Sequence, residues 1–397
     1  MPRAEPEAPA HPTHAVGMAD PYPYYAGLRA RGPVLRDEAS GLILATTSAA
    51  VRAVLAAPQA RVRPPGQPVP PAIEGSPAGA VFGRLVRMTD GQAQAQRKTA
   101  IVAAIAGCDP EAIAADARSR TRAAVEASSK DSSAPPTPTD LAFRIPVETV
   151  AALCGYPAER ASAFAALVGR FVGAISPIAT PAEVEDAKRA AAALLDETRA
   201  LWRRPGHGLA HAVADELDRA RPGDEEARDA NVIGLMSQTY DATAGLVGNA
   251  LVALARHPDV AARLGADPGL AAGVVREAAR HDAAIQNTRR VLADAAEIAG
   301  VALAPGDTVL LLLASANRDE AANPEPDVFD PARRDPVLHT FSEGAHRCPG
   351  AGIAVAIATG MIAGLSEIGF SPARIALDRL AYLPSANARI PVISGGW

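Results

Sequence analysis

The segment Glu225–Arg256 limits the possible folds more than any other part of the sequence, because it forms one long, uninterrupted helical pattern. The sequence His257-Pro258-Asp259 then ends this pattern and starts a new one. The most apolar part, residues 231–255, is a poor membrane span because polar side chains interrupt it. These residues are Gln238, Thr239, Asp241 and Asn249. We therefore expect a buried helix in a soluble, largely helical protein that needs no membrane.

The rest of the chain is also mostly helical in pattern, with a small β component. Helical spacing is present at Tyr22–Arg31, Thr47–Ala56, Gln94–Ala106, Pro110–Ala127, Ala161–Ala174, Pro181–Trp202, Pro258–Leu264, Pro268–Arg280 and Ala351–Leu365. Strands are expected at Gly41–Thr46, Val291–Ile298, Asp307–Ala314 and Arg389–Ser394. Pro391 predicts a sheet edge, and Pro64–Pro71 and Ser128–Thr139 are expected to be loops. The sequence predicts a mainly α fold with small β-sheets, as one domain over residues 1–397.

Charge and termini exclude several classes of protein. The formal net charge of −5 argues against a nucleic-acid-binding protein, which normally carries a basic surface. The N-terminal sequence lacks the apolar stretch of a signal peptide, and its Pro, Ala and Glu residues predict a flexible tail over residues 1–17. Three cysteines in 397 residues exclude a disulfide framework and indicate a reducing cytoplasm.

One of these cysteines has an informative context. Cys348 lies in Phe341-Ser-Glu-Gly344-Ala-His346-Arg347-Cys348-Pro349-Gly350, a glycine-rich segment just before the helical pattern Ala351–Leu365. The thiol is thus expected in a loop at a helix N-terminus, where backbone N–H groups favour a thiolate. A thiolate presented in this way is suited to ligate haem iron.

This segment resembles the haem-ligand signature of the cytochrome P-450 family. In that signature Phe is followed by Gly, Arg or His, Cys and Gly at fixed spacing, and Phe341, Gly344, His346, Cys348 and Gly350 match it. The resemblance implies haem b as the cofactor, with Cys348 as its metal ligand and with Phe341 and Gly350 among the residues that bind the cofactor.

Upstream segments extend the resemblance from about Asp20 to the C-terminus. Glu277-Ala-Ala-Arg280 resembles the Glu-x-x-Arg motif of the family, and Arg333 would complete a structural network with this pair. The resemblance assigns Arg290 and His346 to the haem propionates. Gln94 and Lys98 stand where the family has a propionate-binding His and Arg.

The long helix departs from the family at its catalytic positions, Asp241, Ala242 and Thr243. The family has an acid followed by an alcohol, which together relay protons during oxygen activation. Asp241 keeps the acid, but Ala242 replaces the alcohol, and Thr243 is rotated about 100° around the helix. Two explanations remain open. A substrate hydroxyl or an ordered water completes the proton relay, or the reaction depends less on the alcohol, as in oxidative coupling or nitration.

The substrate pocket is expected to be lined by the loop Arg63–Phe82 and by two further groups of residues. These are Gln238 and Tyr240 on the long helix, and Ile285, Gln286 and Asn287 before the strand that carries Arg290. The two amides of the last segment suggest a small peptide, a cyclodipeptide or an aromatic natural product. Alternatively, these amides satisfy backbone groups.

The resemblance implies an oxidoreductase that takes electrons from a ferredoxin and its reductase. Such an enzyme would hydroxylate or couple a small-molecule substrate, as a cytoplasmic monomer. The basic residues Arg97, Lys98 and Arg347 are expected to meet the acidic ferredoxin. A haem-binding sensor or recognition protein without turnover is the alternative, because the missing alcohol makes it conceivable.

Overall fold

The computed structural model describes residues 8–130, 135–173, 178–204 and 206–397. The described helices are α1 (Tyr22–Arg31), α2 (Ser48–Ala56), α3 (Pro77–Phe82), α4 (Gly91–Ile105), α5 (Pro110–Lys130), α6 (Pro138–Leu153), α7 (Ala161–Gly173), α8 (Pro181–Leu201), α9 (Leu209–Ala220), α10 (Glu225–Arg256), α11 (Pro258–Ala266), α12 (Ala271–His281), α13 (Leu313–Asn317) and α14 (Ala351–Glu367). The expected fold class, mainly α with small β-sheets, is confirmed. None of the described helices is both long enough and apolar enough to cross a bilayer.

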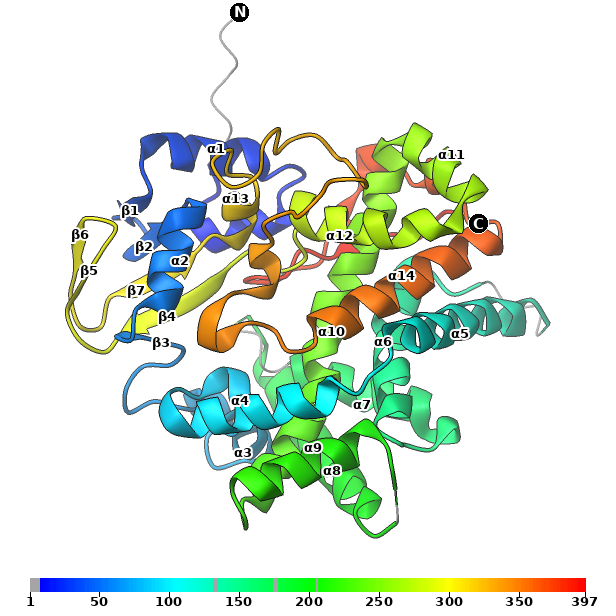
Figure 1. Cartoon of the computed structure of the whole chain (residues 1–397), viewed down its shortest axis with the longest axis horizontal. Helices are drawn as coiled ribbons and strands as arrows, with labels where there is room; N and C mark the ends of the chain where they lie inside the picture. Colours follow the sequence, from blue (N-terminus) through cyan, green and yellow to red (C-terminus); the bar gives the residue numbers. More distant parts are fainter. Residues whose placement is uncertain (1–7, 131–134, 174–177, 205) are drawn as a thin grey trace, which may run out of the picture.

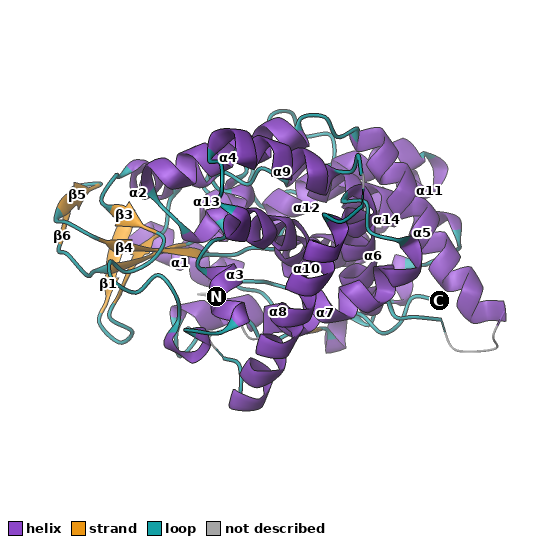
Figure 2. Ribbon diagram, turned by 90° about the horizontal axis from the view of Figure 1, so that it is seen from below, coloured by secondary structure: helices purple, strands orange, loops and turns teal. Residues whose placement is uncertain are grey.

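Strands lie mostly at one end of the molecule, and helices fill most of the rest, as Figure 2 shows. They are β1 (Val34–Asp37), β2 (Leu42–Ala45), β3 (Ala60–Arg61), β4 (Thr288–Leu292), β5 (Ala296–Ile298), β6 (Val301–Leu303), β7 (Thr308–Leu311), β8 (Ala381–Tyr382) and β9 (Pro391–Val392). The five-stranded sheet has the order β1-β2-β7-β4-β3, and only the β2–β7 pair is parallel. The pairs β5–β6 and β8–β9 form separate two-stranded sheets, so Pro391 lies on an edge strand as predicted.

The long helix α10 crosses the middle of the molecule (Figure 1). Its first turn carries Glu225 and Glu226, which favour a helix N-terminus, and it ends at Arg256 before the Pro258 restart. The predicted bounds of α10 and α1 are confirmed. Because α10 contacts α6, α12 and α14, it forms the central element on which the other helices pack.

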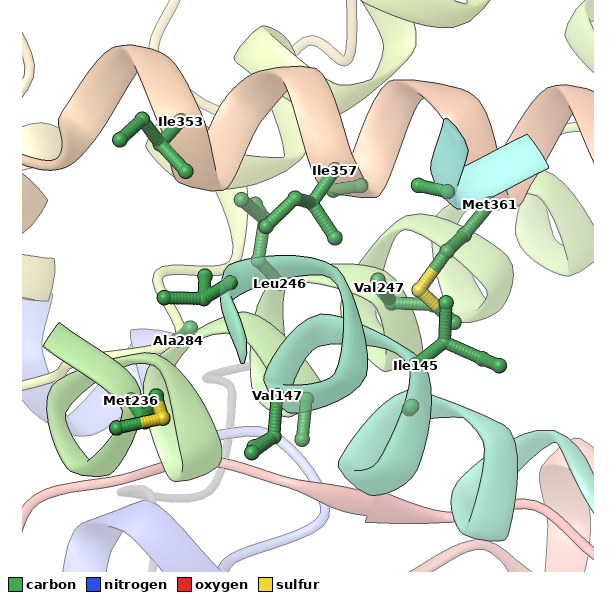
Figure 3. Packing of buried hydrophobic residues seen from close by; sticks show 14 of the residues in the cluster. Ile145, Val147, Met236, Leu246, Val247, Ala284, Ile353, Ile357 and Met361 are labelled. Atoms are coloured by element: carbon green, nitrogen blue, oxygen red, sulfur yellow. The ribbon is translucent and has the colours of Figure 1, made fainter. Parts of the chain in front are cut away.

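Apolar side chains spaced one turn apart join these helices. Ile353, Ile357 and Met361 lie on one face of α14, and Figure 3 shows them above Leu246 and Val247 of α10. Each of these two α10 residues is at most 2% exposed. Burying a side chain of this size stabilises the fold by roughly 1.5–3 kcal/mol, so this packing fixes α14, and the loop before it, relative to α10.

Three local predictions are wrong. The expected strand Val291–Ile298 is divided into β4 and β5, and the hairpin between β5 and β6 turns at Ala299 and Gly300, both with positive φ. The strand expected over Asp307–Ala314 ends at Leu311, and α13 follows. The expected loop Ser128–Thr139 overlaps the ends of two helices, because Thr137 and Asp140 form a capping box that starts α6.

The predicted N-terminal tail also needs correction over its described part. Pro12–Gly17 forms a 3-10 helix in which Ala15 and Val16 are fully or almost fully buried. The side chain of His11 accepts a hydrogen bond from the Thr13 N–H and caps this turn. Residues 1–7 of the predicted tail lie outside the described residues.

Candidate functional site

The loop before α14 holds Cys348 by hydrogen bonds within the loop. The Cys348 N–H donates to the Phe341 carbonyl at 2.7 Å, and the Arg347 N–H donates to the Gly344 carbonyl at 3.1 Å. Gly344 has a φ of +63°, which a side chain would strain, so the tight turn explains this glycine. Gly350 is the N-cap residue of α14, and a Cβ there would meet nothing within 4 Å. The structure thus brings Phe341, Cys348 and Gly350 together and leaves open space beside the helix start.

The surroundings of Cys348 act on its thiol in opposite directions. Burial raises the pKa of Cys348, while a hydrogen bond from the Gly350 N–H and the nearby cations of Lys98 and Arg347 oppose that rise. A bound metal would deprotonate such a thiol outright. Cys348 is therefore a partly buried thiol, and one backbone N–H and two nearby cations favour its deprotonated form.

One stripe of the central helix remains accessible although α10 lies inside the molecule. Leu235 and the residues 238–242 are half-buried, whereas almost every residue after Ala242 is buried. Among them Leu235, Gln238, Thr239 and Ala242 are three and four residues apart, so these four lie on one helix face. An accessible face on a central helix indicates internal space beside α10.

The three candidate catalytic positions lie in different environments. Burial raises the pKa of Asp241, and Arg87 opposes this shift. Ala242 belongs to the accessible stripe. Thr243 is only 1% exposed, and its hydroxyl is buried with no hydrogen-bond partner among the described residues. Thr243 therefore does not present its hydroxyl to the space beside Ala242.

The two expected propionate partners Arg290 and His346 lie near a carboxylate of the protein itself. Asp90 accepts a hydrogen bond from His346 Nε2 at 3.1 Å and one from the Val62 N–H at 3.0 Å. Burial acts to raise the pKa of Asp90, but these hydrogen bonds outweigh it and lower the pKa. Arg290 is 4% exposed; burial lowers its pKa, and Asp90 opposes the change. Asp90 was not among the predicted site residues, although its position two residues after Met88 marks the start of α4.

The structure gives Gln94 and Lys98 local partners. The Gln94 amide donates to the Ala345 carbonyl at 2.9 Å, and Lys98 Nζ donates to the Arg347 carbonyl. Both residues thus fasten α4 to the Cys348 loop. Burial lowers the pKa of Lys98, while Cys348 raises it, so the ammonium lies near the thiol.

The pocket residues predicted from amide groups need correction. Gln286 is fully buried: its carbonyl accepts from the Tyr25 hydroxyl at 2.9 Å, and its amide donates to the Ala283 carbonyl at 3.0 Å. Asn287, 2% exposed, donates to the Ala386 carbonyl. These contacts support the alternative interpretation, that the amides satisfy internal polar groups. Sequence alone could not distinguish a substrate-binding amide from one that satisfies backbone groups, because both roles place the amide inside the protein.

The other expected pocket residues are placed differently. Ile285 is half-buried and forms a bridge with Ala388. The Tyr240 ring packs on Phe143 with 4.6 Å between centroids, and its hydroxyl occupies the space at Gly169. Gln238 lies on the accessible stripe of α10. The segment Arg63–Phe82, expected to be a loop, contains α3 and the buried residue Ile73.

The three residues expected to be structural lie in one buried network. Arg280 donates to both Glu277 oxygens, at 2.6 and 2.9 Å, and to the carbonyls of Pro326 and Val328. Arg333 Nε donates to Glu277 at 3.3 Å. The network therefore ties α12 to the segment that leads to the Cys348 loop.

Known proteins match this chain in sequence and in fold. The family model described as Cytochrome P450 matches residues 270–363. Cytochrome P450 133B2 of Xylella fastidiosa is 37% identical over 152 residues, which are 34% of this chain and 38% of that protein. The vitamin D(3) 25-hydroxylase of Pseudonocardia autotrophica is 33% identical over 283 residues, which are 65% of this chain and 66% of that protein. Both matches thus span less than two thirds of the relative's length.

Two solved structures share the fold over nearly the whole chain. CalO2 superposes with a TM-score of 0.82 at 23% identity, covering 99% of this chain and 100% of its own. P450BioI was solved with an acyl carrier protein that bears hexadec-9Z-enoic acid. It superposes with a TM-score of 0.80 at 21% identity, covering 96% of this chain and 98% of its own. The sequence matches and this fold show that the chain belongs to the cytochrome P450 family. The cofactor of that family is haem b with a cysteine thiolate as axial ligand.

The residues present fit this cofactor. A thiol lies at the start of α14 beside open space, a central helix leaves one face accessible, and the guanidinium of Arg290 is buried near His346. Arg87, which was not among the predicted site residues, is a further cation, and Asp241 is the charged group that acts on it. Its only signal in the sequence is its place three residues before Asp90.

Proposed function

We propose that the chain is a haem-thiolate oxidoreductase of the monooxygenase type that acts on a small natural-product molecule. The single observation that carries the proposal is the Cys348 loop, in which the Phe341 carbonyl and the Gly350 N–H fix the thiol at the start of α14. Three relatives support this reaction class. They are a C-19 steroid 1alpha-hydroxylase, a vitamin D(3) 25-hydroxylase and the cytochrome P450 monooxygenase PikC.

Each side chain of the site has a role in this proposal. Bound haem would supply the redox chemistry that activates O₂ and oxidises the substrate. Cys348 would ligate the iron, and Arg290 and His346 would hold the propionates. Asp241, whose pKa burial raises, would exchange a proton at its carboxyl group. Because the Thr243 hydroxyl is buried away from the accessible stripe, a water or a substrate hydroxyl would complete the proton path beside Ala242.

Electrons would come from a ferredoxin and its reductase, at the face that carries the Cys348 loop. Arg347 is exposed there and suits an acidic partner. Arg97, which the sequence assigned to the same surface, is committed to Asp224 at 2.7 Å and is 12% exposed. The partner surface therefore centres on Arg347 rather than Arg97. We further expect a single-domain monomer in a reducing cytoplasm.

The test is the carbon-monoxide difference spectrum of the reduced protein. The wild type should show the red-shifted Soret band of a thiolate-ligated haem, and Cys348→Ser should lose it, because a neutral hydroxyl donates far less electron density to iron. Cys108→Ser is the matched control, since Cys108 is half-buried and lies in no motif. A wild type without the thiolate band, or a Cys348→Ser variant that keeps it, would contradict the proposal.

A haem-binding protein without turnover is the second candidate, and the buried hydroxyl of Thr243 beside Ala242 favours it. The two candidates share the spectrum but differ in chemistry. Oxidised product from a protein reconstituted with ferredoxin, reductase and NADPH would exclude the second candidate.

A further inference from the structure

A buried amide fixes the chain segment before α4 against the central helix. The Asn231 side chain accepts from the Val86 N–H at 2.8 Å and donates to the Arg84 carbonyl at 3.0 Å. One turn later, Gly234 permits close approach, because a Cβ there would lie 2.9 Å from Leu85. The segment 84–86 thus runs directly along α10.

Arg87 directly follows this segment in the chain. One face of α10, next to the accessible stripe, carries residues at intervals of three and four: Asn231, Gly234, Gln238 and Asp241. Asp241 is the charged group that acts on the Arg87 guanidinium. Among the described residues the two side chains form no ion pair, so Asp241 acts on Arg87 only from a distance.

The guanidinium of Arg87 has unused hydrogen-bonding capacity. The residue is exposed, yet burial lowers its pKa to about 10, which is expected for a side chain that lines an internal space. Among the described residues, none forms a hydrogen bond or ion pair with it. Arg280 and Arg389, in contrast, each donate to a carboxylate and to backbone carbonyls.

We propose that Arg87 binds a carboxylate of the substrate, so that the pocket beside Asp241 is specific for organic acids. The planar guanidinium offers paired N–H donors that match a carboxylate bidentately. Gln238 lies on the accessible stripe, one turn before Asp241, and its uncharged amide can bind the rest of the substrate. The inference rests on the proposed function, because it takes this space as the substrate site.

A haem propionate is the competing acceptor, and the charges near Asp90 argue against it. Asp90 lies three residues after Arg87, but His346, Arg290 and Arg61 act on it. The charge that acts on Arg87 is instead that of Asp241 on the long helix. The propionate candidates and Arg87 are thus two distinct groups of charges.

The test compares acids with their methyl esters by calorimetric titration of the purified full chain. The probes are dodecanoate and N-acetyltryptophan, each beside its methyl ester. The wild type should bind at least one acid more tightly than its ester by about tenfold or more, as a charge-assisted hydrogen bond allows. Arg87→Met should reduce this ratio to about one, and Arg87→Lys should retain part of it.

Arg84→Met is the matched control, because Arg84 pairs with Glu226 on the outer surface three residues away. This variant should keep the wild-type ratio. Esters that bind as well as the acids, or the binding of neither acid, would overturn the proposal. An Arg87→Met variant that keeps the ratio but loses haem would assign Arg87 to a propionate and would also overturn it.

The absorption spectrum of each calorimetry sample separates this proposal from the proposed function. A sample without haem would count against the proposed function, while the ratio of acid to ester binding would still decide the role of Arg87.

Discussion

At Ala242 the central helix presents a methyl group to the accessible space where the family has an alcohol. The next hydroxyl along the chain, at Thr243, is buried and has no hydrogen-bond partner among the residues that the structure describes. The residue that can still titrate here is Asp241, because burial raises its pKa and Arg87 limits the rise. A protein that moves protons at this point therefore depends on the acid and on a group that the chain does not supply.

Substitutions at these two positions test that dependence. Asp241→Asn should lower turnover by about a hundredfold, as expected when a general acid–base group is lost. Ala242→Thr should leave the ratio of product to released peroxide unchanged, because another group already completes the path. The ratio is measured with NADPH, ferredoxin and reductase, using the ligand that gives the largest substrate-induced spectral shift.

Two results would contradict this account. Higher coupling in Ala242→Thr, with the same product, would mean that the missing alcohol is a simple defect. An Asp241→Asn variant with full turnover would remove the acid from the proton path.

At the scale of elements, periodicity predicted helices well and strands less well. The pattern Glu225–Arg256 is the helix α10 without change, because its acidic start and its Pro258 restart are both local signals. The break between β4 and β5 was missed because β4 pairs with β3 and β7 while β5 pairs with β6, and the sequence does not show which strands pair. Gln286 was misassigned for a different reason: its partner Tyr25 lies far away in the sequence, and only the fold brings them together.

The network of Glu277, Arg280 and Arg333 leads to a prediction for stability. Arg280 is fully buried and Glu277 is 2% exposed, so removing the carboxylate leaves an uncompensated cation inside the protein. Glu277→Ala should therefore lower the free energy of unfolding by about 3–5 kcal/mol. Urea denaturation of the full chain measures the change.

Glu197→Ala provides the control because its ion-pair partner, Arg160, is 53% exposed. Such a surface pair should contribute about 1 kcal/mol or less. Similar losses in the two variants would mean that burial does not decide the effect of the Glu277 network.

At the scale of the whole molecule, Arg389 joins the two ends of the described chain. Its guanidinium donates to Asp282 at 2.9 Å and to the carbonyls of Val16, Met18 and Ala19 at 2.6–3.0 Å. It also lies 3.5 Å from the centre of the Tyr382 ring. The N-terminal segment is thus held by contacts with residues more than 250 positions away in the sequence. Composition does not show such distant contacts, so the sequence alone predicted a flexible tail.

Replacing this guanidinium with an ammonium should loosen the N-terminal segment before the rest of the fold. Arg389→Lys keeps the charge near Asp282 but cannot reach all three carbonyls, so these buried acceptors lose their donor. We expect a loss of about 2–4 kcal/mol in unfolding free energy and faster proteolytic cleavage within residues 8–20. Arg379→Lys is the control, because that side chain is 86% exposed. If Arg389→Lys is cleaved no faster than the control, the apolar contacts of Ala15 and Val16 hold the segment, and Arg389 is not its main anchor.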